Sequence, residues 1–167
     1  TNQVIYAIQH QSIWETIVLA HFLPGPLSIV MKQEVISLPI IGFLFKKFGA
    51  IPLNRGKQIK SIRTLVSDAQ KAVKKGDSIL IYPQGTRVKC DEQPPFKKGV
   101  GKIYKALNLP CIPVALNTGK IWPKNSFTKN PGDIHISFLE PILSGKESEE
   151  FVNDLENQIY NEIKKLS

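Results

Sequence analysis

Residues 5–15 decide how this chain is expected to fold, and they read Ile-Tyr-Ala-Ile-Gln-His-Gln-Ser-Ile-Trp-Glu. A short apolar run ends just before His10, and Ser12 and Glu15 follow with Ser-x-x-Glu spacing. This spacing is typical of a capping box, in which the two side chains satisfy free N–H groups at the start of a helix. The stretch therefore predicts a buried strand over residues 3–9 that leads directly into a helix over residues 12–23.

The spacing of His10 and Glu15 limits what the two side chains can do together. Five positions apart, they would point about 140° away from each other in a continuous helix. They can meet only if His10 precedes the helix, where Glu15 could accept a hydrogen bond from one ring nitrogen and fix the tautomer. The alternative is that Glu15 only caps the N–H of Ser12 and that His10 is a loop histidine. This stretch by itself favours the alternative, and the rest of the chain favours the pair.

Composition narrows the classes of protein to consider. The chain has 167 residues, 42% of them hydrophobic and 22% charged, which is ordinary for one globular domain. Its formal net charge of +8 indicates an anionic partner, which could be nucleic acid, a phosphorylated substrate or an acidic membrane surface. A nucleic-acid-binding surface would need a basic stripe interleaved with aromatic residues. The cations here are scattered, so nucleic acid is disfavoured as a partner.

The two cysteines, Cys90 and Cys111, do not make a disulfide or metal-binding framework, and a reducing compartment is the simplest interpretation. No apolar run approaches the ~18–20 residues that span a bilayer.

Strands and helices are expected to alternate along the chain. Strands are predicted at 27–31, 50–53, 78–82, 111–116 and 134–139, and helices at 58–75, 99–108 and 147–166, with loops at 83–98 and 122–132. Ile13, Ile17 and Phe22 are expected among the apolar positions of the first helix, and His135 is expected to be a structural side chain of a strand. The alternation predicts an α/β fold with a mostly parallel central sheet flanked by helices.

An apolar run over residues 35–45 has two interpretations. It could form a buried core helix that starts near Pro39, which is the favoured interpretation. Alternatively, it could present an apolar surface to a lipid or acyl chain, with Lys46 and Lys47 facing phosphate headgroups.

Residues with binding or acid–base chemistry follow several of the predicted strands. His10, Arg55 and the Gly85-Thr86-Arg87 turn would gather at the carboxyl edge of a parallel sheet, where ligands bind in such folds. Arginine forks suit phosphate oxygens, and a glycine turn lets backbone N–H groups approach an anion. Taken singly, Arg55 could be a solvated loop charge and Gly85-Thr86 an ordinary turn. Together they indicate a general base beside an anion pocket.

Four blocks, in order, resemble the glycerolipid acyltransferases, and most closely the bacterial 1-acylglycerol-3-phosphate acyltransferases. The His-x4-Asp motif of that family is similar to His10 and Glu15. Its arginine block is similar to residues 51–56 (Ile-Pro-Leu-Asn-Arg-Gly), its Glu-Gly-Thr-Arg block to residues 83–87 (Pro-Gln-Gly-Thr-Arg), and its apolar block to residues 111–116. Residues 96–100 also fit the segment that follows the third block, and the resemblance covers roughly residues 3–143.

Two positions depart from the family pattern. Glu15 stands where the family usually has Asp, and the longer side chain can still reach the imidazole, as in a subgroup of the family. Gln84 stands where the family usually has Glu, so a hydrogen-bonding group is kept and a charge is lost.

The resemblance implies direct acyl transfer from acyl-CoA or acyl-carrier protein to the free hydroxyl of 1-acylglycerol-3-phosphate, giving phosphatidic acid. His10, oriented by Glu15, would take the hydroxyl proton. The substrate phosphate would be held by Arg55, Gly85, Thr86 and Arg87, with Lys32 added because of its charge. No metal or organic cofactor is expected.

The resemblance also implies a place for the chain in the cell. We expect residues 1–167 to form one catalytic domain whose partners are a lysophospholipid, an acyl donor and a membrane surface. The domain would work at the cytoplasmic face of a membrane, such as the bacterial inner membrane, either peripherally or through a preceding N-terminal segment.

Two alternatives to this reaction stay open, and a third is disfavoured. The acceptor could instead be glycerol-3-phosphate or a lyso-aminolipid, and Gln84 leaves open a relative that binds anionic lipid without catalysis. Ser12 as an acyl-enzyme nucleophile is disfavoured by its expected capping role.

Overall fold

The computed structural model describes residues 3–47, 49–53 and 58–166. Within these ranges a six-stranded sheet has the order β3-β2-β4-β1-β5-β6. The strands are β1 (Ile5–Ile8), β2 (Leu27–Lys32), β3 (Ile51–Leu53), β4 (Ser78–Ile81), β5 (Cys111–Leu116) and β6 (Ile136–Phe138). Every pairing is parallel except that of β5 with β6, which confirms the predicted mostly parallel sheet.

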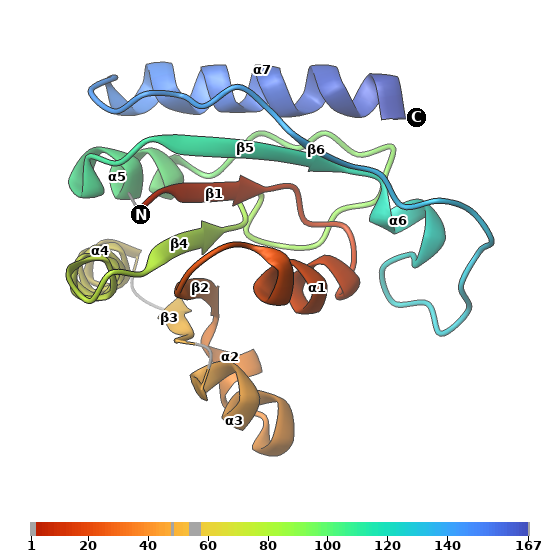
Figure 1. Ribbon diagram of the computed structural model, residues 1–167, viewed down its shortest axis with the longest axis horizontal. Coiled ribbons are helices and arrows are strands. Elements are labelled where there is room, and N and C mark those ends of the chain that lie inside the picture. The colour runs from red at the N-terminus through yellow and green to blue at the C-terminus, as the bar shows by residue number, and fades with distance from the viewer. Residues whose placement is uncertain (1–2, 48, 54–57, 167) are drawn as a thin grey trace.

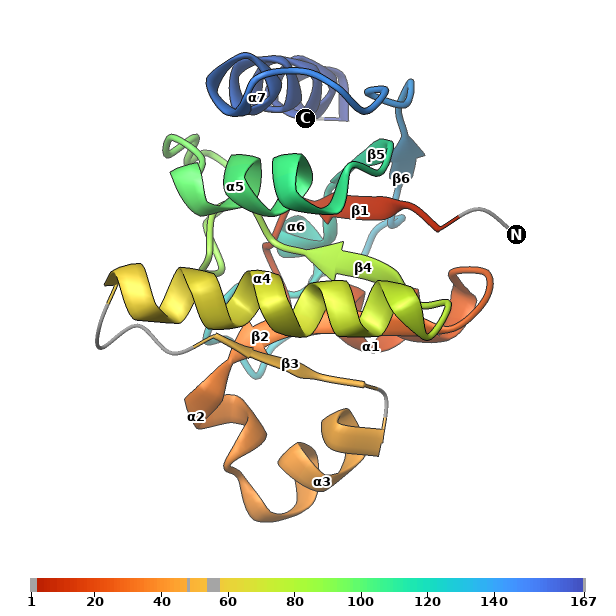
Figure 2. The ribbon, with the colours of Figure 1, turned by 90° about the vertical axis from the view of Figure 1, so that its left-hand side faces the viewer.

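Helices cover both faces of the sheet (Figure 1). The described helices are α1 (Trp14–Phe22), α2 (Gln33–Ile36), α3 (Pro39–Lys47), α4 (Gln58–Lys74), α5 (Lys98–Leu107), α6 (Thr118–Ile121) and α7 (Ser148–Leu166). Figure 2 shows α4 and α5 side by side on the face that α7 also covers, and Figure 1 shows α1 on the other face. The result is a three-layer α/β arrangement, as the sequence predicts.

Alternate side chains of β1 point to opposite faces of the sheet and pack into two separate hydrophobic cores. Ile5 and Ala7 join the cluster beneath α4, α5 and α7, whereas Tyr6 and Ile8 join the smaller cluster beneath α1. Successive strand residues point to opposite faces, so one short strand supplies both cores. Each fully buried large apolar side chain contributes about 1.5–3 kcal/mol, which holds the strand rigidly where it leads into His10.

The first helix differs from the prediction at its start, and the apolar residues that were singled out for it do not face the core. It begins at Trp14 instead of residue 12, and Ile13, Ile17 and Phe22 are exposed. Leu19, together with Leu23 just beyond the helix, packs beneath the helix against the sheet instead. The apolar residues on the outer side of α1 are therefore not core residues, because the sheet can contact only one side of the helix.

The apolar run over 35–45 begins its helix at Pro39 as predicted, but the interpretation as a buried core helix is wrong for much of it. Figures 1 and 2 show α2 and α3 projecting from the body of the molecule. Leu38 and Phe43 are exposed, and Ile36 and Phe45 are buried. The run lies beyond the two cores, so it cannot bury all its apolar side chains. No helix in the described part of the chain is long and apolar enough to cross a bilayer.

Two short helices and one strand boundary also differ. The four-residue helices α2 and α6 were not predicted, because one turn shows no helical periodicity. The last strand is shorter than the predicted 134–139, and His135 lies just before it with an exposed side chain.

Candidate active site

His10 lies directly beyond the carboxyl end of β1, where the chain leaves the sheet. The preceding residue still bonds to the sheet, through the N–H of Gln9 and the carbonyl of Val114 at 3.1 Å. The His10 ring stacks on Tyr82, with ring centroids 3.9 Å apart and an interplanar angle of 22°. The side chain is 18% exposed. The imidazole is thus held by packing while part of it can meet a substrate.

The Glu15 carboxylate is fully buried and accepts four hydrogen bonds. Its Oε1 accepts from His10 Nδ1 at 2.9 Å and from the backbone N–H groups of Gln11 and Ser12, both at 2.7 Å. Its Oε2 accepts from Thr118 Oγ1 at 2.8 Å. A buried charge is tolerated only when it is compensated in this way.

This arrangement fixes the tautomer of His10. A carboxylate can only accept, so the Nδ1 that faces it carries a proton. In a neutral ring the other nitrogen, Nε2, then has a free lone pair. His10 is therefore set up to act as a general base through Nε2.

The Glu15 carboxylate makes the hydrogen bonds expected under both of the interpretations that the sequence left open. Glu15 reaches back to the Ser12 N–H, as in a capping box, and the same oxygen also bonds to the His10 ring. Ser12 Oγ in turn accepts the N–H of Trp14 at 3.3 Å. The predicted contact of His10 with Glu15 is present, because His10 lies before the helix.

Two residues that the sequence did not single out complete the surroundings of His10. Tyr82 follows β4 and donates its hydroxyl to Thr16 Oγ1 at 2.7 Å. Burial, together with the charge of Glu15, raises the pKa of Tyr82 and keeps it protonated. Thr118 follows β5 and is fully buried against Glu15. Their positions directly after strands, like that of His10, are the signal that could have found them.

The turn after β4 contacts His10 through the backbone. Gly85 has a positive φ of 70°, which favours glycine, and its N–H donates to the Tyr82 carbonyl at 2.9 Å. The Val88 N–H donates to the His10 carbonyl at 2.8 Å, and Gln84 Oε1 accepts the His10 N–H at 3.2 Å. The structure therefore brings the third block of the sequence against the first.

The candidate phosphate ligands lie in different settings. Thr86 is exposed and Arg87 is half-buried, both in the turn that contacts His10. Lys32 ends β2 at the same edge of the sheet, but it is exposed and forms an ion pair with Glu34 at 3.2 Å. Arg55 lies outside the described residues. Phosphate binding by these residues stays a prediction.

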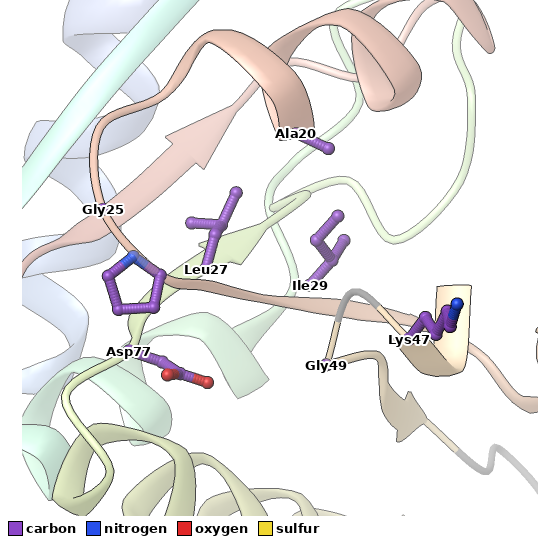
Figure 3. A pocket seen from close by; sticks show the side chains of 8 residues that line it. Ala20, Gly25, Leu27, Ile29, Lys47, Gly49 and Asp77 are labelled. Atoms are coloured by element: carbon purple, nitrogen blue, oxygen red, sulfur yellow. The ribbon is translucent and has the colours of Figure 1, made fainter. Parts of the chain in front are cut away.

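A cavity of about 360 Å³ lies at the opposite edge of the sheet. Figure 3 shows Leu27 and Ile29 of β2 lining it, with Ala20 of α1, Lys47 of α3 and Asp77 around them. Since β2 and β4 are parallel to β1, the amino ends of these strands are far from His10. Among the described residues, no group of three or more His, Cys, Asp or Glu side chains is placed to hold a metal ion.

A histidine bonded to a buried carboxylate, at the carboxyl edge of the sheet in a three-layer α/β fold, agrees with the family that the sequence resembles. A family model described as Acyltransferase matches residues 1–117. The chain belongs to the acyltransferase family.

Two curated relatives show which members of this family the chain is similar to. The chain is 34% identical over 128 residues to a 1-acyl-sn-glycerol-3-phosphate acyltransferase of Pseudomonas aeruginosa, covering 77% of this chain and 49% of that protein. It is 30% identical over 160 residues to one of Cocos nucifera, covering 95% of this chain and 52% of that protein. The chain thus spans about half the length of these curated relatives.

A solved structure confirms the fold. The crystal structure of the 1-acyl-sn-glycerophosphate (LPA) acyltransferase PlsC from Thermotoga maritima superposes with a TM-score of 0.82 at 21% identity. The match covers 99% of this chain and 66% of that one.

Proposed function

We propose that the chain transfers an acyl group from acyl-CoA or acyl-carrier protein to the free hydroxyl of 1-acylglycerol-3-phosphate, giving phosphatidic acid. The observation that carries the proposal is the hydrogen bond between His10 Nδ1 and the buried Glu15, which leaves Nε2 as a base. The names of the relatives in Pseudomonas aeruginosa and Cocos nucifera support the choice of acceptor.

In the proposed reaction, Nε2 of His10 takes the proton of the acceptor hydroxyl as its oxygen attacks the thioester carbonyl carbon. A carbon–oxygen bond forms, the carbon–sulfur bond breaks, and the imidazolium returns the proton to the leaving thiolate. Glu15 stabilises the imidazolium through Nδ1, and stacking on Tyr82 keeps the ring in one orientation. No group outside the two substrates has to be added to balance the step.

Binding of the substrate phosphate would position the hydroxyl. Arg87 and Thr86 support this role because their turn is bonded to the His10 backbone. Gly85, Lys32 and Arg55 are the further candidates. Holding the reacting groups in place can supply a large part of the rate enhancement.

We propose that the reaction takes place at a membrane surface, because both acceptor and product are lipids, and at its cytoplasmic face, because acyl-CoA and acyl-carrier protein are cytoplasmic donors. The exposed part of α3 supports this location. Phe43 is 61% exposed, and Lys47 Nζ lies 5.7 Å from the centroid of its ring. An apolar ring beside a cation fits the boundary between acyl chains and anionic headgroups.

The test is thiol release from acyl-CoA and from acyl-carrier protein by the natural full-length protein. Lysophosphatidate, glycerol-3-phosphate and a lyso-aminolipid would be offered in turn, with donor alone as the control. Release that needs lysophosphatidate, with phosphatidic acid as the product, is the expected result. Release with only one of the other acceptors would move the function to that acceptor. Folded protein that binds lipid and releases no thiol would contradict catalysis.

A further inference from the structure

The backbone of His10 is held on both sides by the segment that follows β4. Its N–H donates to Gln84 Oε1 at 3.2 Å, and its carbonyl accepts the Val88 N–H at 2.8 Å. These bonds fix the peptide groups from which the imidazole projects. The direction of the side chain therefore depends on residues 84–88 as well as on Glu15 and Tyr82.

The sheet register explains why a side chain makes the first of these bonds. Ala7 pairs with Ile81 in the parallel ladder of β1 and β4, so the same register would place His10 opposite Gln84. The chain turns away after Ile81, at the Tyr82–Gly85 turn, so the backbone ladder ends there. The side-chain oxygen of Gln84 takes the place of the next backbone carbonyl.

The burial of Gln84 indicates which of its atoms matters. The residue is only 2% exposed. Burial raises the pKa of Tyr160 to about 12, and the neighbouring Gln84 amide offsets part of that rise. Even so, Nε2 of Gln84 makes no hydrogen bond of good geometry to the described residues. Burying an unsatisfied N–H is unfavourable, so stability alone would favour an apolar side chain here.

We propose that Gln84 is a positioning residue for His10, which acts through its side-chain oxygen by holding the His10 N–H and so aiming the imidazole at the acceptor hydroxyl. This inference rests on the proposed function. It also accounts for the departure from the usual glutamate of the family. Glutamate and glutamine both offer an acceptor oxygen to the His10 N–H. Glutamine does so without placing a second carboxylate beside His10, which already contacts the Glu15 carboxylate.

Gln9, the residue that precedes His10 in the chain, supplies a matched control for Gln84. It is fully buried, and both polar atoms of its amide lack a hydrogen-bond partner among the described residues. Gln9→Met and Gln84→Met therefore make the same chemical change at equally buried sites. Only Gln84→Met removes a bond to His10.

The experiment compares Gln84→Met, Gln84→Glu and Gln9→Met in the full-length protein. Steady-state kinetics give kcat and both KM values, and amide hydrogen exchange reports on the His10 N–H without any substrate. We expect Gln84→Met to lower kcat ~10–100-fold with both KM values within ~2-fold. The His10 amide of Gln84→Met should exchange at least ~10-fold faster, because its acceptor is lost. Gln9→Met should keep kcat within ~3-fold of the wild type, and Gln84→Glu, which keeps an acceptor oxygen for the His10 N–H, should recover most of the kcat that Gln84→Met loses.

Several results would overturn the role. One is an unchanged kcat and unchanged exchange in Gln84→Met. Another is an equal loss of kcat in Gln9→Met or in Gln84→Glu. A rise in KM for lysophosphatidate at constant kcat would make Gln84 a substrate ligand instead. If Gln84→Met does not fold, Gln84→Asn, whose shorter side chain cannot reach the His10 N–H, takes its place. If the wild type transfers no acyl group, the proposed function fails, and the exchange measurement still tests the contact.

Discussion

The side chains around His10 make hydrogen bonds within the fold, whereas the projecting helix α3 leaves an apolar side chain in solvent. Around His10, the Glu15 carboxylate and the Thr118 and Tyr82 hydroxyl groups each make a hydrogen bond within the fold. On α3, by contrast, Phe43 faces solvent, although the helix is largely apolar. The Glu15, Thr118 and Tyr82 side chains are held by bonds within the fold, whereas the exposed ring on α3 would gain by contact with an apolar partner. This division agrees with the proposed function, in which a fixed acid–base site would act on lipid substrates at a membrane surface.

Apart from the removal of His10 itself, the largest effect is expected when the charge of Glu15 is removed. Glu15→Gln removes the negative charge that stabilises the imidazolium of His10 and replaces one of the two acceptor oxygens by an NH2 group. We expect kcat to fall ~10²–10⁴-fold and the free energy of unfolding to fall by roughly 2–4 kcal/mol. Kinetics and urea unfolding measure the two effects.

The control for this change is Glu156→Gln. Glu156 also accepts a backbone N–H, that of Phe96 at 2.7 Å, but it lies on α7 and does not touch His10. Its substitution should leave kcat near the wild-type value. Equal losses of kcat in the two variants would show that His10 does not depend specifically on Glu15.

A smaller effect is expected at the other oxygen of the same carboxylate. Thr118→Val keeps the side-chain shape and removes the donor to Glu15 Oε2. We expect kcat to fall ~10-fold and stability to fall by about 1–2 kcal/mol. Thr128→Val, in an exposed loop, is the matched control and should change neither. A Thr118→Val protein with wild-type kcat would remove Thr118 from the site.

The projecting region can be tested without measuring catalysis. Phe43→Ser should weaken binding to phosphatidylglycerol vesicles about 5-fold, because less apolar surface is buried on docking. The melting temperature should not fall, since the ring is exposed. Vesicle co-sedimentation measures the binding, and Phe127→Ser is the control, because it makes the same change at a fully exposed ring in the loop after α6. If Phe127→Ser weakens binding as much as Phe43→Ser, α3 is not the specific contact.

The smallest effect on turnover is expected at the Tyr82 hydroxyl. Tyr82→Phe keeps the ring that stacks on His10, so kcat should stay within ~3-fold. Burial raises the pKa of Tyr82 in the folded state. The resulting stability is fully present below pH ~10 and is lost progressively above it, because the unfolded chain ionises there first. Tyr82→Phe should therefore reduce the alkaline fall in unfolding free energy, and an identical fall in both proteins would contradict this.

The sequence predicted the elements with strong periodicity and the parallel sheet. Helices α4, α5 and α7 and strands β1, β4 and β5 lie within two residues of their predicted bounds. The position of α1 on one face, and of α3 outside both cores, could not be predicted. Ile17 and Phe22 have the same hydrophobicity as buried residues, and only the assembled sheet decides which side of a helix it covers.

The site was predictable where it is local. His10 and Glu15 are close in sequence, so their spacing showed that the two side chains can meet only if His10 precedes the helix. That one oxygen serves both the ring and the capping bonds could not be decided, because both arrangements are compatible with that spacing. Thr118 joins Glu15 across 103 positions, through the pairing of β1 with β5, so no local pattern reveals it.

The most direct measurement is acceptor-dependent thiol release by His10→Ala compared with His135→Ala. Both variants remove one imidazole, but His135 is exposed and lies outside the site. If His10 is the base, His10→Ala should lose at least ~10³-fold in kcat while the protein remains folded, and His135→Ala should retain full activity. Substantial acyl transfer by folded His10→Ala would contradict the role of His10 as the general base.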